Sequence, residues 1–421
     1  MSEKRTPEIR FKGYTDPWEQ RKLLDCIQKI TDFRGRTPKK LGMDWSETGY
    51  LALSALNVKD GYIDFSQDVH YGDQALYDKW MTGNELHKGQ VIFTTEAPMG
   101  NVAQIPDNRR YILSQRTIAF DAKLDLITEN FLATVLRTPI VFASLTALSS
   151  GGTAKGVSQK SLATVDITLP VSLEEQEWVA SMFAGIDNLI TLHQRKYDKL
   201  VKVKKAMLLK MFPQGDAKVP EIRFAGFTDP WEQRKLVEIA SIKTGPFGTQ
   251  LSAKEYTNTG IPVINVKNIG TGSVIETELD HVSEDTARRL HEHRISVNDI
   301  LFGRKGAIGR HAIIKKTEDG WLQGSDCIRV RFNPEIYALF INAALQTDTI
   351  LDYLSSNAYG STMLTLTTEM IASIPVSMPR KEEQIEIAHA LDKVDTLITL
   401  HQRKLEKLKN LKSAMLSKMF V

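Results

Sequence analysis

This sequence of 421 residues contains few cysteines and has a small net charge. Its two cysteines, Cys26 and Cys327, lie in unrelated contexts and lack the spacing of metal ligands. This argues against a disulfide framework or a zinc ribbon and fits a reducing compartment. The formal net charge is only +3, which excludes a uniformly basic coat, so any nucleic-acid contact has to come from local clusters of Lys and Arg.

Long apolar runs are missing as well. The start, MSEKRTPEIRF, has no apolar segment after its charges, so we expect no signal peptide. The most apolar stretch, Phe131 to Leu148, is interrupted by Arg137 and Pro139, which favours a buried helical segment over a membrane span. We therefore expect a cytoplasmic protein without a membrane anchor, long enough for two or three folded units.

Catalytic motifs are scarce too. Asp16-Pro17-Trp18 and its copy Asp229-Pro230-Trp231 look like the acidic loop of an adenine methyltransferase, but they lack its second proline, so turn structure is favoured. The segment from Gly303 to Arg310 is glycine-rich and basic but matches neither the dinucleotide fingerprint nor the P-loop, and contact with DNA phosphate and a plain hairpin are equal alternatives. We predict no catalytic residue and no metal ligand.

The sequence is written twice. The segment from Pro7 to Leu23 returns from Pro220 to Leu236 with two differences, and LITLHQRK returns unchanged at residues 397–404. Between these frames most residues differ, although short alternating segments followed by Gly, Asn or Asp indicate strands and turns in both halves. We align Asn57-Val58-Lys59 with Asn265-Val266-Lys267. Nearly identical frames around dissimilar central segments predict two domains of the same architecture with two different specificities. The alternative is that the central segments diverged without selection after a duplication.

Each half ends in a long segment without proline, and apolar residues recur there at intervals of three and four. This spacing predicts one helix per half with a narrow apolar stripe that needs a partner surface. The partner is the other copy or the helix's own domain. His193 and His401 fall on the stripes, where a polar residue most often sets the register rather than binding a metal. The residues expected to pair are Ile186, Ile190, His193, Tyr197, Leu200 and Met207 in the first helix, and Val394, Ile398, His401, Leu405, Leu408 and Met415 in the second, with Val203 and Leu411 on the same stripes.

Local clusters of basic and amide side chains are candidates for DNA contact. Arg and Lys can neutralise phosphates or fork onto guanine, whereas Gln and Asn can bracket adenine; a solvated surface role is the alternative for each. The candidates of the first half are Arg34, Arg36, Lys39, Lys40, Lys59, Arg109, Arg110, Gln115, Arg116, Thr153 and Lys155, and those of the second half are Lys243, Gln250, Lys267, Asn268, Arg304, Lys305, Arg310, His311, Gln323, Ser361 and Thr362.

The ordered set of these features resembles the specificity subunit of type I restriction-modification enzymes. Both halves contain a Gly/Ser/Thr loop, an exit such as Ile374-Pro375-Val376, and Glu-Glu-Gln opening a long helix; the segment from Gly260 to Lys267 is clear, but its counterpart near Asn57 is weaker. The resemblance implies an α+β protein with two tandem target recognition domains, and long helices pairing as an antiparallel coiled coil with pseudo-twofold symmetry. We expect recognition domains at residues 1–172 and 214–380, and spacer helices at residues 173–213 and 381–421.

The same resemblance implies a non-catalytic subunit that reads a bipartite site in double-stranded DNA. Each recognition domain would read one half-site and the helices would fix the gap. The partners would be two methyltransferase subunits, which use S-adenosylmethionine to methylate adenine, and restriction subunits, which use ATP and Mg²⁺. No cofactor is expected on this chain. A methyltransferase or nuclease with unfamiliar motifs, and a coiled-coil scaffold without DNA specificity, are the competing hypotheses.

Overall fold

The computed structural model describes residues 6–149, 156–306, 309–358 and 365–420. The chain divides into two compact units, one formed by Met1–Gln194 with Arg403–Val421 and the other by Arg195–Gln402. Each unit therefore takes part of one long helix from the other half of the sequence. Cys26 and Cys327 are buried free thiols in different units, in agreement with the expectation of no disulfide between them.

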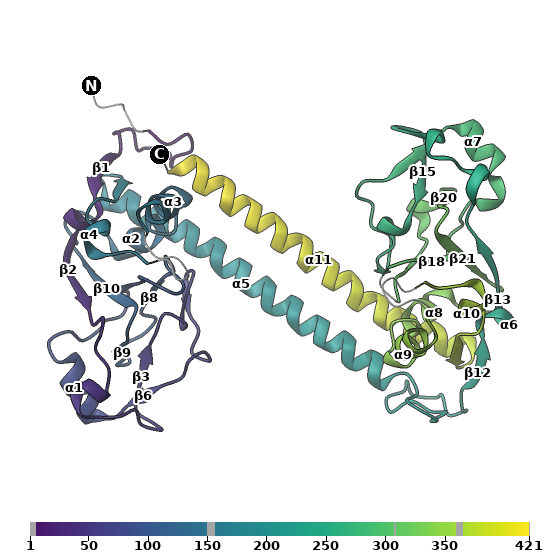
Figure 1. Cartoon of the computed structure of the whole chain (residues 1–421), viewed down its shortest axis with the longest axis horizontal. Coiled ribbons are helices and arrows are strands. Elements are labelled where there is room, and N and C mark those ends of the chain that lie inside the picture. Colours follow the sequence, from purple (N-terminus) through teal and green to yellow (C-terminus); the bar gives the residue numbers. More distant parts are fainter. Residues whose placement is uncertain (1–5, 150–155, 307–308, 359–364, 421) are drawn as a thin grey trace. The chain divides into compact units, whose positions relative to one another are not determined.

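The first unit mixes short strands with short helices (Figure 1). Its elements before the long helix are β1 (Glu19–Lys22), β2 (Ile27–Asp32), β3 (Tyr50–Leu53), β4 (Val58–Lys59), β5 (Tyr62–Ile63), β6 (Tyr71–Gly72), α1 (Gln74–Met81), β7 (Val91–Thr94), β8 (Val102–Gln104), β9 (Ile112–Leu113), β10 (Thr117–Ala122), α2 (Glu129–Val135), α3 (Pro139–Leu148), α4 (Gln159–Leu162) and β11 (Asp166–Leu169).

Two sheets organise this unit. One has the strand order β2-β10-β7-β8 and is antiparallel throughout, and the other has the order β6-β3-β9, in which β3 and β9 run parallel. Strand β7 reads Val-Ile-Phe-Thr and is buried on both faces, as expected for a continuous run of β-branched and aromatic residues at the centre of a fold. Strands β7 and β10 are two of the short strands that the alternating segments predict.

The second unit repeats this plan with larger main sheets. Its elements are β12 (Glu232–Lys235), α6 (Leu236–Ile239), β13 (Ala240–Thr244), β14 (Tyr256–Thr257), β15 (Ile261–Ile264), β16 (Thr271–Gly272), β17 (Asp280–Val282), α7 (Glu284–Arg289), β18 (Ile300–Gly303), β19 (His311–Ile313), β20 (Leu322–Gln323), β21 (Cys327–Phe332), α8 (Ala338–Ala344), α9 (Asp348–Asn357), α10 (Thr368–Ala372) and β22 (Pro375–Met378). Its main sheets have the orders β13-β21-β18-β19-β16 and β14-β17-β15-β20, and β15 and β20 again run parallel. The expected α+β fold class is confirmed.

The two long helices are α5 (Leu173–Lys210) and α11 (Lys381–Met419), as the sequence predicts. In the first unit Asp187 of α5 pairs with Lys412 of α11 at 2.7 Å, and in the second unit Lys204 of α5 pairs with Asp395 of α11 at 2.6 Å. From the first pair to the second, the residue number rises by 17 on α5 and falls by 17 on α11. This is the register of an antiparallel pair in which equivalent residues of the two copies make the same contact.

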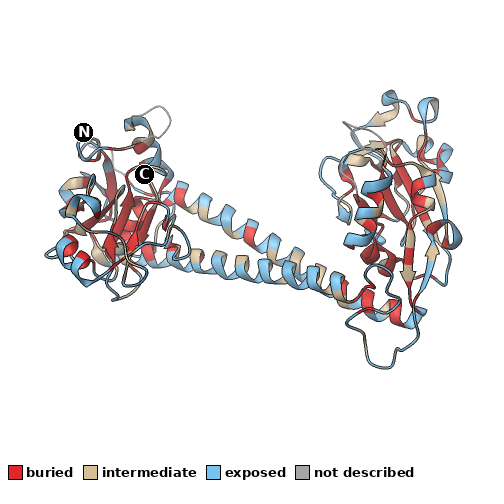
Figure 2. Cartoon of the chain, turned by 60° about the horizontal axis from the view of Figure 1, so that its bottom comes forward, coloured by how far each residue is buried: buried red, intermediate tan, exposed pale blue. Residues whose placement is uncertain are grey.

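The stripe expected on each helix is its less exposed face, with one correction. Val203 and Leu411, which occupy equivalent positions, are 38% and 47% exposed. The neighbouring Lys204 and Lys412 lie on the covered side instead, since a lysine stem can pack along apolar surface while its ammonium reaches an aspartate of the other helix. All twelve residues that we expect to pair are buried or half-buried, whereas the outer faces are exposed (Figure 2).

The end of each long helix completes the core of the domain encoded by the other half. Phe420 packs against Trp18 and Phe131 of the first unit, with ring centroids 5.7 and 5.9 Å away. Phe212 packs against Trp231 and Phe340 of the second unit, at 5.8 and 5.4 Å. The repeated Asp-Pro-Trp and Met-Phe motifs are therefore packing motifs of the fold.

The repeated N-terminal frame lies beside these helix ends (Figure 1). The Ile9 N–H donates to the carbonyl of Lys418 at 3.1 Å, and the Ile222 N–H donates to the carbonyl of Lys210 at 2.8 Å. Arg10 also forks onto the buried carboxylate of Glu175 at 2.7 and 2.8 Å. The near-identical frames thus serve the same structural contact in each unit.

Among the described residues, no single helix is both long and apolar enough to cross a membrane. The bent pair α2 and α3 passes such a test jointly, by length and composition only. Residues of this pair, including Phe131, Leu132, Val141 and Leu145, are buried in the hydrophobic core of the first unit.

Candidate nucleic-acid interface

The parallel strands β3 and β9 bring two loops to one edge of the first unit. Ala52 pairs with Ile112 and Leu53 with Leu113, so the chain leaves both strands side by side. The carboxyl ends of neighbouring parallel strands are a common place for binding loops, because loop side chains converge there on a rigid scaffold.

A cavity of about 360 Å³ opens at this edge. It is lined by Arg36, Thr37, Pro38, Lys39, Asp44, Trp45, Ser54, Ala55, Leu56, Asp68, Trp80, Ala97, Ser114, Gln115 and Arg116. The cavity combines cations, an amide and indole rings, which are the groups that contact phosphates, base edges and base faces. Of the predicted candidates, the structure brings Arg36, Lys39, Gln115 and Arg116 together here.

Three non-glycine residues of the cavity have backbones in the left-handed region. They are Asp68, Ala97 and Arg116, with φ of 44°, 45° and 64°. Such conformations cost of the order of 1–3 kcal/mol each and concentrate at ligand sites, where the surrounding structure imposes them. Only two further described non-glycine residues have positive φ, Glu278 and Asn298.

The cavity side chains are held by local contacts. The Arg36 guanidinium stacks on Phe33 at 4.3 Å and donates to the carbonyl of Trp80 at 2.7 Å. Gln115 donates to the carbonyl of Arg36, which ties the loop after β9 to the loop after β2. Arg116 is 56% exposed and only loosely paired with Glu96, at 3.8 Å, so its charge points into solvent.

The loop after β2 is anchored by Asp32. Its carboxylate accepts hydrogen bonds from Arg34, at 2.9 Å from the backbone N–H and 2.8 Å from Nε, and from Gln159 at 2.8 Å. Burial of Asp32 works to raise its pKa, but these hydrogen bonds and the charge of Arg34 dominate and hold the pKa below its ordinary value. Arg34 is thus committed to positioning the loop.

The corresponding edge of the second unit lies where β15 and β20 end. Val263 pairs with Leu322 and Ile264 with Gln323. The following loops approach so closely that a Cβ on Gly324 would lie 2.0 Å from Oδ1 of Asn265, so this position has no space for a side chain. The second edge therefore has the same scaffold as the first edge, with different side chains.

Arg304 lies beside this second edge, because its backbone N–H donates to the carbonyl of Asp326, in the loop after β20, at 2.8 Å. Its guanidinium lies over the ring of Phe247 at 4.9 Å, and its Nε is buried without a hydrogen-bond partner among the described residues. Lys305 lies nearby, 3.5 Å from Asp326. Residues 307–308 of the glycine-rich segment from Gly303 to Arg310 lie outside the described residues.

The strand registers correct the alignment of the two halves. Asn57 accepts from the Ser54 N–H at 2.8 Å and donates to the carbonyl of Asp64 at 3.2 Å. Asn268 accepts from the Asn265 N–H at 3.2 Å and donates to the carbonyl of Ile275 at 3.1 Å. Asn57 is therefore equivalent to Asn268 rather than to Asn265, and both hold the turn that follows the parallel strand.

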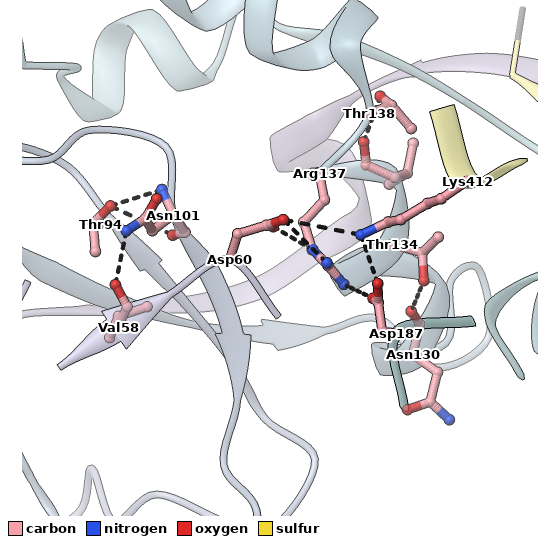
Figure 3. Close-up of polar contacts among 11 residues, drawn as sticks. Val58, Asp60, Thr94, Asn101, Asn130, Thr134, Arg137, Thr138, Asp187 and Lys412 are labelled. Carbon is pink, nitrogen blue, oxygen red and sulfur yellow. Dashed lines mark hydrogen bonds and ion pairs between the residues drawn. The ribbon is translucent and has the colours of Figure 1, made fainter. Parts of the chain in front are cut away.

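Four predicted DNA contacts have structural roles instead. Asn268, His311 and Gln323 have no exposed surface, and each hydrogen-bonds to carbonyl groups of its own unit. Burial lowers the pKa of His311, although hydrogen bonds to carbonyl groups oppose this effect. Arg310 donates to the carbonyl of Ile269 at 2.7 Å, which is the role of Asn101 toward Val58 in the first unit (Figure 3). Sequence analysis could not separate these from surface residues, since short strands give little information on burial.

The remaining candidates lie around the two edges or away from them. Lys40 donates to the carbonyl of Gly35, Gln250 accepts from the Phe247 N–H, and Lys243 and Lys267 pair with acidic neighbours. Lys59, Arg109 and Arg110 do not line the cavity, and Arg109 lies over Phe65 while Arg110 lies over Tyr77. Thr153, Lys155, Ser361 and Thr362 lie outside the described residues.

Several cavity residues were not predicted. Trp45, Asp68 and Ala97 line the cavity although none belongs to a basic cluster. The available signals were a tryptophan in a turn-rich segment and an alanine before a proline, and both patterns are too common to single out a site. Among the described residues, no group of three or more His, Cys, Asp or Glu side chains could hold a metal ion.

Comparison with known families assigns this architecture. Residues 15–202 and 228–410 each match the family model of the type I restriction modification DNA specificity domain. The chain belongs to this family. The two matched regions each combine a sheet-rich domain with most of one long helix, as the internal repeat predicts.

Curated relatives of this specificity family align with most of the chain. The specificity subunit of the type I restriction enzyme MjaVIII from Methanocaldococcus jannaschii is 23% identical over 414 residues, covering 96% of this chain and 92% of the relative. The EcoKI specificity subunit of Escherichia coli is 20% identical over 314 residues, covering 70% and 65%. A crystal structure of the type I S subunit from M. genitalium has a TM-score of 0.67 at 16% identity and covers 99% of both chains, which shows a shared fold.

Proposed function

We propose that this chain is the DNA-recognition subunit of a type I restriction-modification enzyme and that it reads a bipartite site in double-stranded DNA. Residues 1–172 and 214–380 form the two recognition domains, and each reads one half-site. Membership of the specificity-domain family supports DNA recognition. The reading of two half-sites rests on one observation: equivalent loop edges carry different side chains, while the frames around them are nearly identical.

The loop edge of each unit is the proposed reading surface. In the first domain the central contacts are Arg36, Lys39, Gln115 and Arg116 around the cavity, with Lys40, Lys59, Arg109 and Arg110 as outer phosphate contacts. In the second domain they are Arg304 and Lys305, with Lys243, Gln250 and Lys267 around them. Base contacts at the centre give specificity, and phosphate contacts at the rim give register.

The helices α5 and α11 act as the spacer in this proposal. A helix of 38 residues is roughly 57 Å long, which exceeds one turn of DNA of about 35 Å. The length of the helices would then fix the gap between the half-sites, independently of the bases that the loops read.

The helices also offer two equivalent surfaces for partner subunits. Leu189 and Leu192 are 46% and 47% exposed on α5, and their copies Leu397 and Leu400 are each 43% exposed on α11. The two leucines of each pair are three residues apart and so lie on one helix face, where they form an apolar patch that a partner subunit would cover. Two copies of one surface would bind two copies of one partner, which fits recruitment of two methyltransferase subunits, with restriction subunits joining that assembly. Methyl transfer with S-adenosylmethionine and ATP-driven cleavage would belong to these partners.

Replacing the proposed base contacts of each domain separately tests the proposal. In the complex with methyltransferase subunits, Arg36→Ala with Arg116→Ala should weaken and relax the first half-site only, and Arg304→Ala with Lys305→Ala the second only, by roughly 1–3 kcal/mol for each lost base contact. Mapping methylated adenines on genomic DNA reads out both half-sites. Arg288→Ala, at a residue 73% exposed beside Asp285, is the control.

The competing hypotheses have distinct outcomes. Methyl transfer from labelled S-adenosylmethionine by the purified chain alone would indicate an enzyme. Equal binding to random duplexes and to the methylated motif would indicate a scaffold without specificity. Loss of both half-sites in either double variant would contradict the assignment of one half-site to each domain.

A further inference from the structure

Four charged side chains of the first unit meet where its recognition domain touches both long helices (Figure 3). Arg137, between α2 and α3, donates two hydrogen bonds to Asp60 in the turn between β4 and β5 and one at 2.8 Å to Asp187 of α5. Lys412 of α11 completes the cluster, with its Nζ 2.7 Å from Asp187 and 4.0 Å from Asp60. Asp60 is thereby linked to α5 and to α11.

Both cations of this cluster are largely withdrawn from solvent. The side chains of Arg137 and Lys412 are 14% and 17% exposed. Burial works to lower the pKa of Arg137, but the hydrogen bonds and charges of Asp60 and Asp187 raise it above its ordinary value. The guanidinium therefore stays charged, and removing one carboxylate would leave a half-buried charge uncompensated.

The second unit has the same joint with different chemistry. Lys204 and Asp395 repeat Lys412 and Asp187 and pair at 2.6 Å. Gln346, between α8 and α9, takes the place of Arg137; it accepts from Lys204 at 2.7 Å and donates to the carbonyl of Asn342 at 2.9 Å.

Two glycines establish which residues correspond. Gly61 has φ +85°, and a Cβ there would lie 2.8 Å from Nη2 of Arg137. Gly272 has φ +84°, and a Cβ there would lie 2.8 Å from Nε2 of Gln346. The residue before the glycine is Asp60 in the first unit and threonine at position 271 in the second.

The two clusters therefore differ by one acid and one base. The first cluster has two carboxylates and two cations, and the second has one of each. The charges sum to zero in each cluster, so both of these equivalent contacts between a domain and the long helices are electrically neutral. Exchanging only one member of the pair would leave a net charge in a cluster that includes a largely buried cation, Lys412, which is 17% exposed.

We propose that Asp60 and Arg137 are positioning residues that act as a pair: they fix the first recognition domain on α5 and α11 and thereby set the gap at which the first half-site is accepted. This inference rests on the proposed function, because the gap has meaning only for a bipartite site. It predicts that replacing either residue alone weakens the gap preference, whereas replacing both residues with the pair of the second unit preserves it.

The test uses the full chain in complex with methyltransferase subunits. Methylation rates are measured on duplexes carrying both half-sites at the natural gap, or at a gap one base pair shorter or longer. Arg137→Gln and Asp60→Thr should each raise the wrong-gap rate relative to the right-gap rate by about tenfold, within the range of couplings in one ion-pair network. The double variant D60T/R137Q should return this ratio to the wild-type value.

A matched control separates positioning from stability. Arg331→Gln removes an ion pair with the buried Asp299 inside the second recognition domain, where the other hydrogen bonds of Arg331 go to Arg294 and Ser296, and should leave the gap ratio unchanged. If Arg137→Gln does not fold, Asp60→Thr alone still tests the inference, because the Asp60 side chain is 62% exposed and its replacement should allow folding. Wild-type ratios in both single variants, or a double variant no better than the singles, would overturn the inference alone. A wild-type complex without any gap preference would overturn the proposed function and this inference with it.

Discussion

Phe420 lies edge-on against Trp18, with ring centroids 5.7 Å apart and planes at 80°, and Phe212 lies against Trp231 at 5.8 Å and 84°. Each contact inserts a helix end from one half of the sequence into the core of the other half's domain. The two units are thereby completed by reciprocal exchange, which explains why these aromatic motifs recur while the residues between them differ.

Truncating either phenylalanine should destabilise one unit. Phe420→Ala should lower the free energy of unfolding by about 3–5 kcal/mol, because a buried aromatic side chain is lost and a cavity remains. Phe212→Ala should act similarly on the second unit. Denaturant unfolding followed by tryptophan fluorescence measures both. Leu411→Ala, at a residue 47% exposed, is the control, and an equal effect there would contradict the packing role.

The strained backbone of the cavity predicts a trade between stability and function. Arg116→Gly should keep the free energy of unfolding or raise it by up to about 1 kcal/mol, because glycine adopts the φ of 64° without strain. Recognition of the first half-site should nevertheless weaken, because a cation of the cavity is lost. Calorimetry and methylation mapping give the two readouts. Asn298→Gly, at φ 72° outside the cavity, should stabilise without changing recognition.

Asp32 predicts acid sensitivity of the first unit. Its pKa is lowered in the folded state, so its contribution to stability is complete above the unfolded pKa of about 3.9 and is lost as pH falls toward the folded value. Unfolding measured between pH 6 and pH 3 should therefore show a smaller acid loss in Asp32→Asn, which should also be less stable at neutral pH. Parallel curves for variant and wild type would contradict this account.

The repeated elements could be predicted from the sequence, because the frames are nearly identical and the apolar stripes of the helices have a regular spacing. It could not predict which side chains of short strands are buried. Gln323 lies on a two-residue strand with no exposed surface, yet the same amide in a loop would be a good base contact. The pairing of Lys204 with Asp395 could not be predicted either, because the residues of the opposite helix determine whether a lysine can lie on the covered side. Loop geometry likewise placed Trp45 and Asp68 in the cavity without a local signal.

The exposed leucines of the helices predict stepwise loss of partner subunits. Leu192→Glu should remove one methyltransferase subunit from the complex, and Leu192→Glu with Leu400→Glu should remove both, because a charge at the centre of an apolar contact is costly to bury. Native mass spectrometry reports the stoichiometry. Glu406→Gln, elsewhere on α11, is the control. Retention of both subunits in the double variant would place the contact on another surface.

Shortening the two helices together gives the most direct test of the spacer. The segment Val201–Leu208 contains Lys204 and part of the second core, so a deletion there would also break the joint with the second domain. Deleting His193–Lys199 with His401–Lys407 instead removes seven matching residues from each helix and keeps the exposed leucines proposed as partner contacts. The gap should shorten by about 10 Å, or about three base pairs at roughly 3.4 Å each, while both half-site sequences stay the same. Mapping of methylated adenines reads the gap directly. Deleting only one of the two segments puts the paired helices out of register and should abolish site-specific methylation, whereas an unchanged gap in the double deletion would mean that something other than helix length sets the distance.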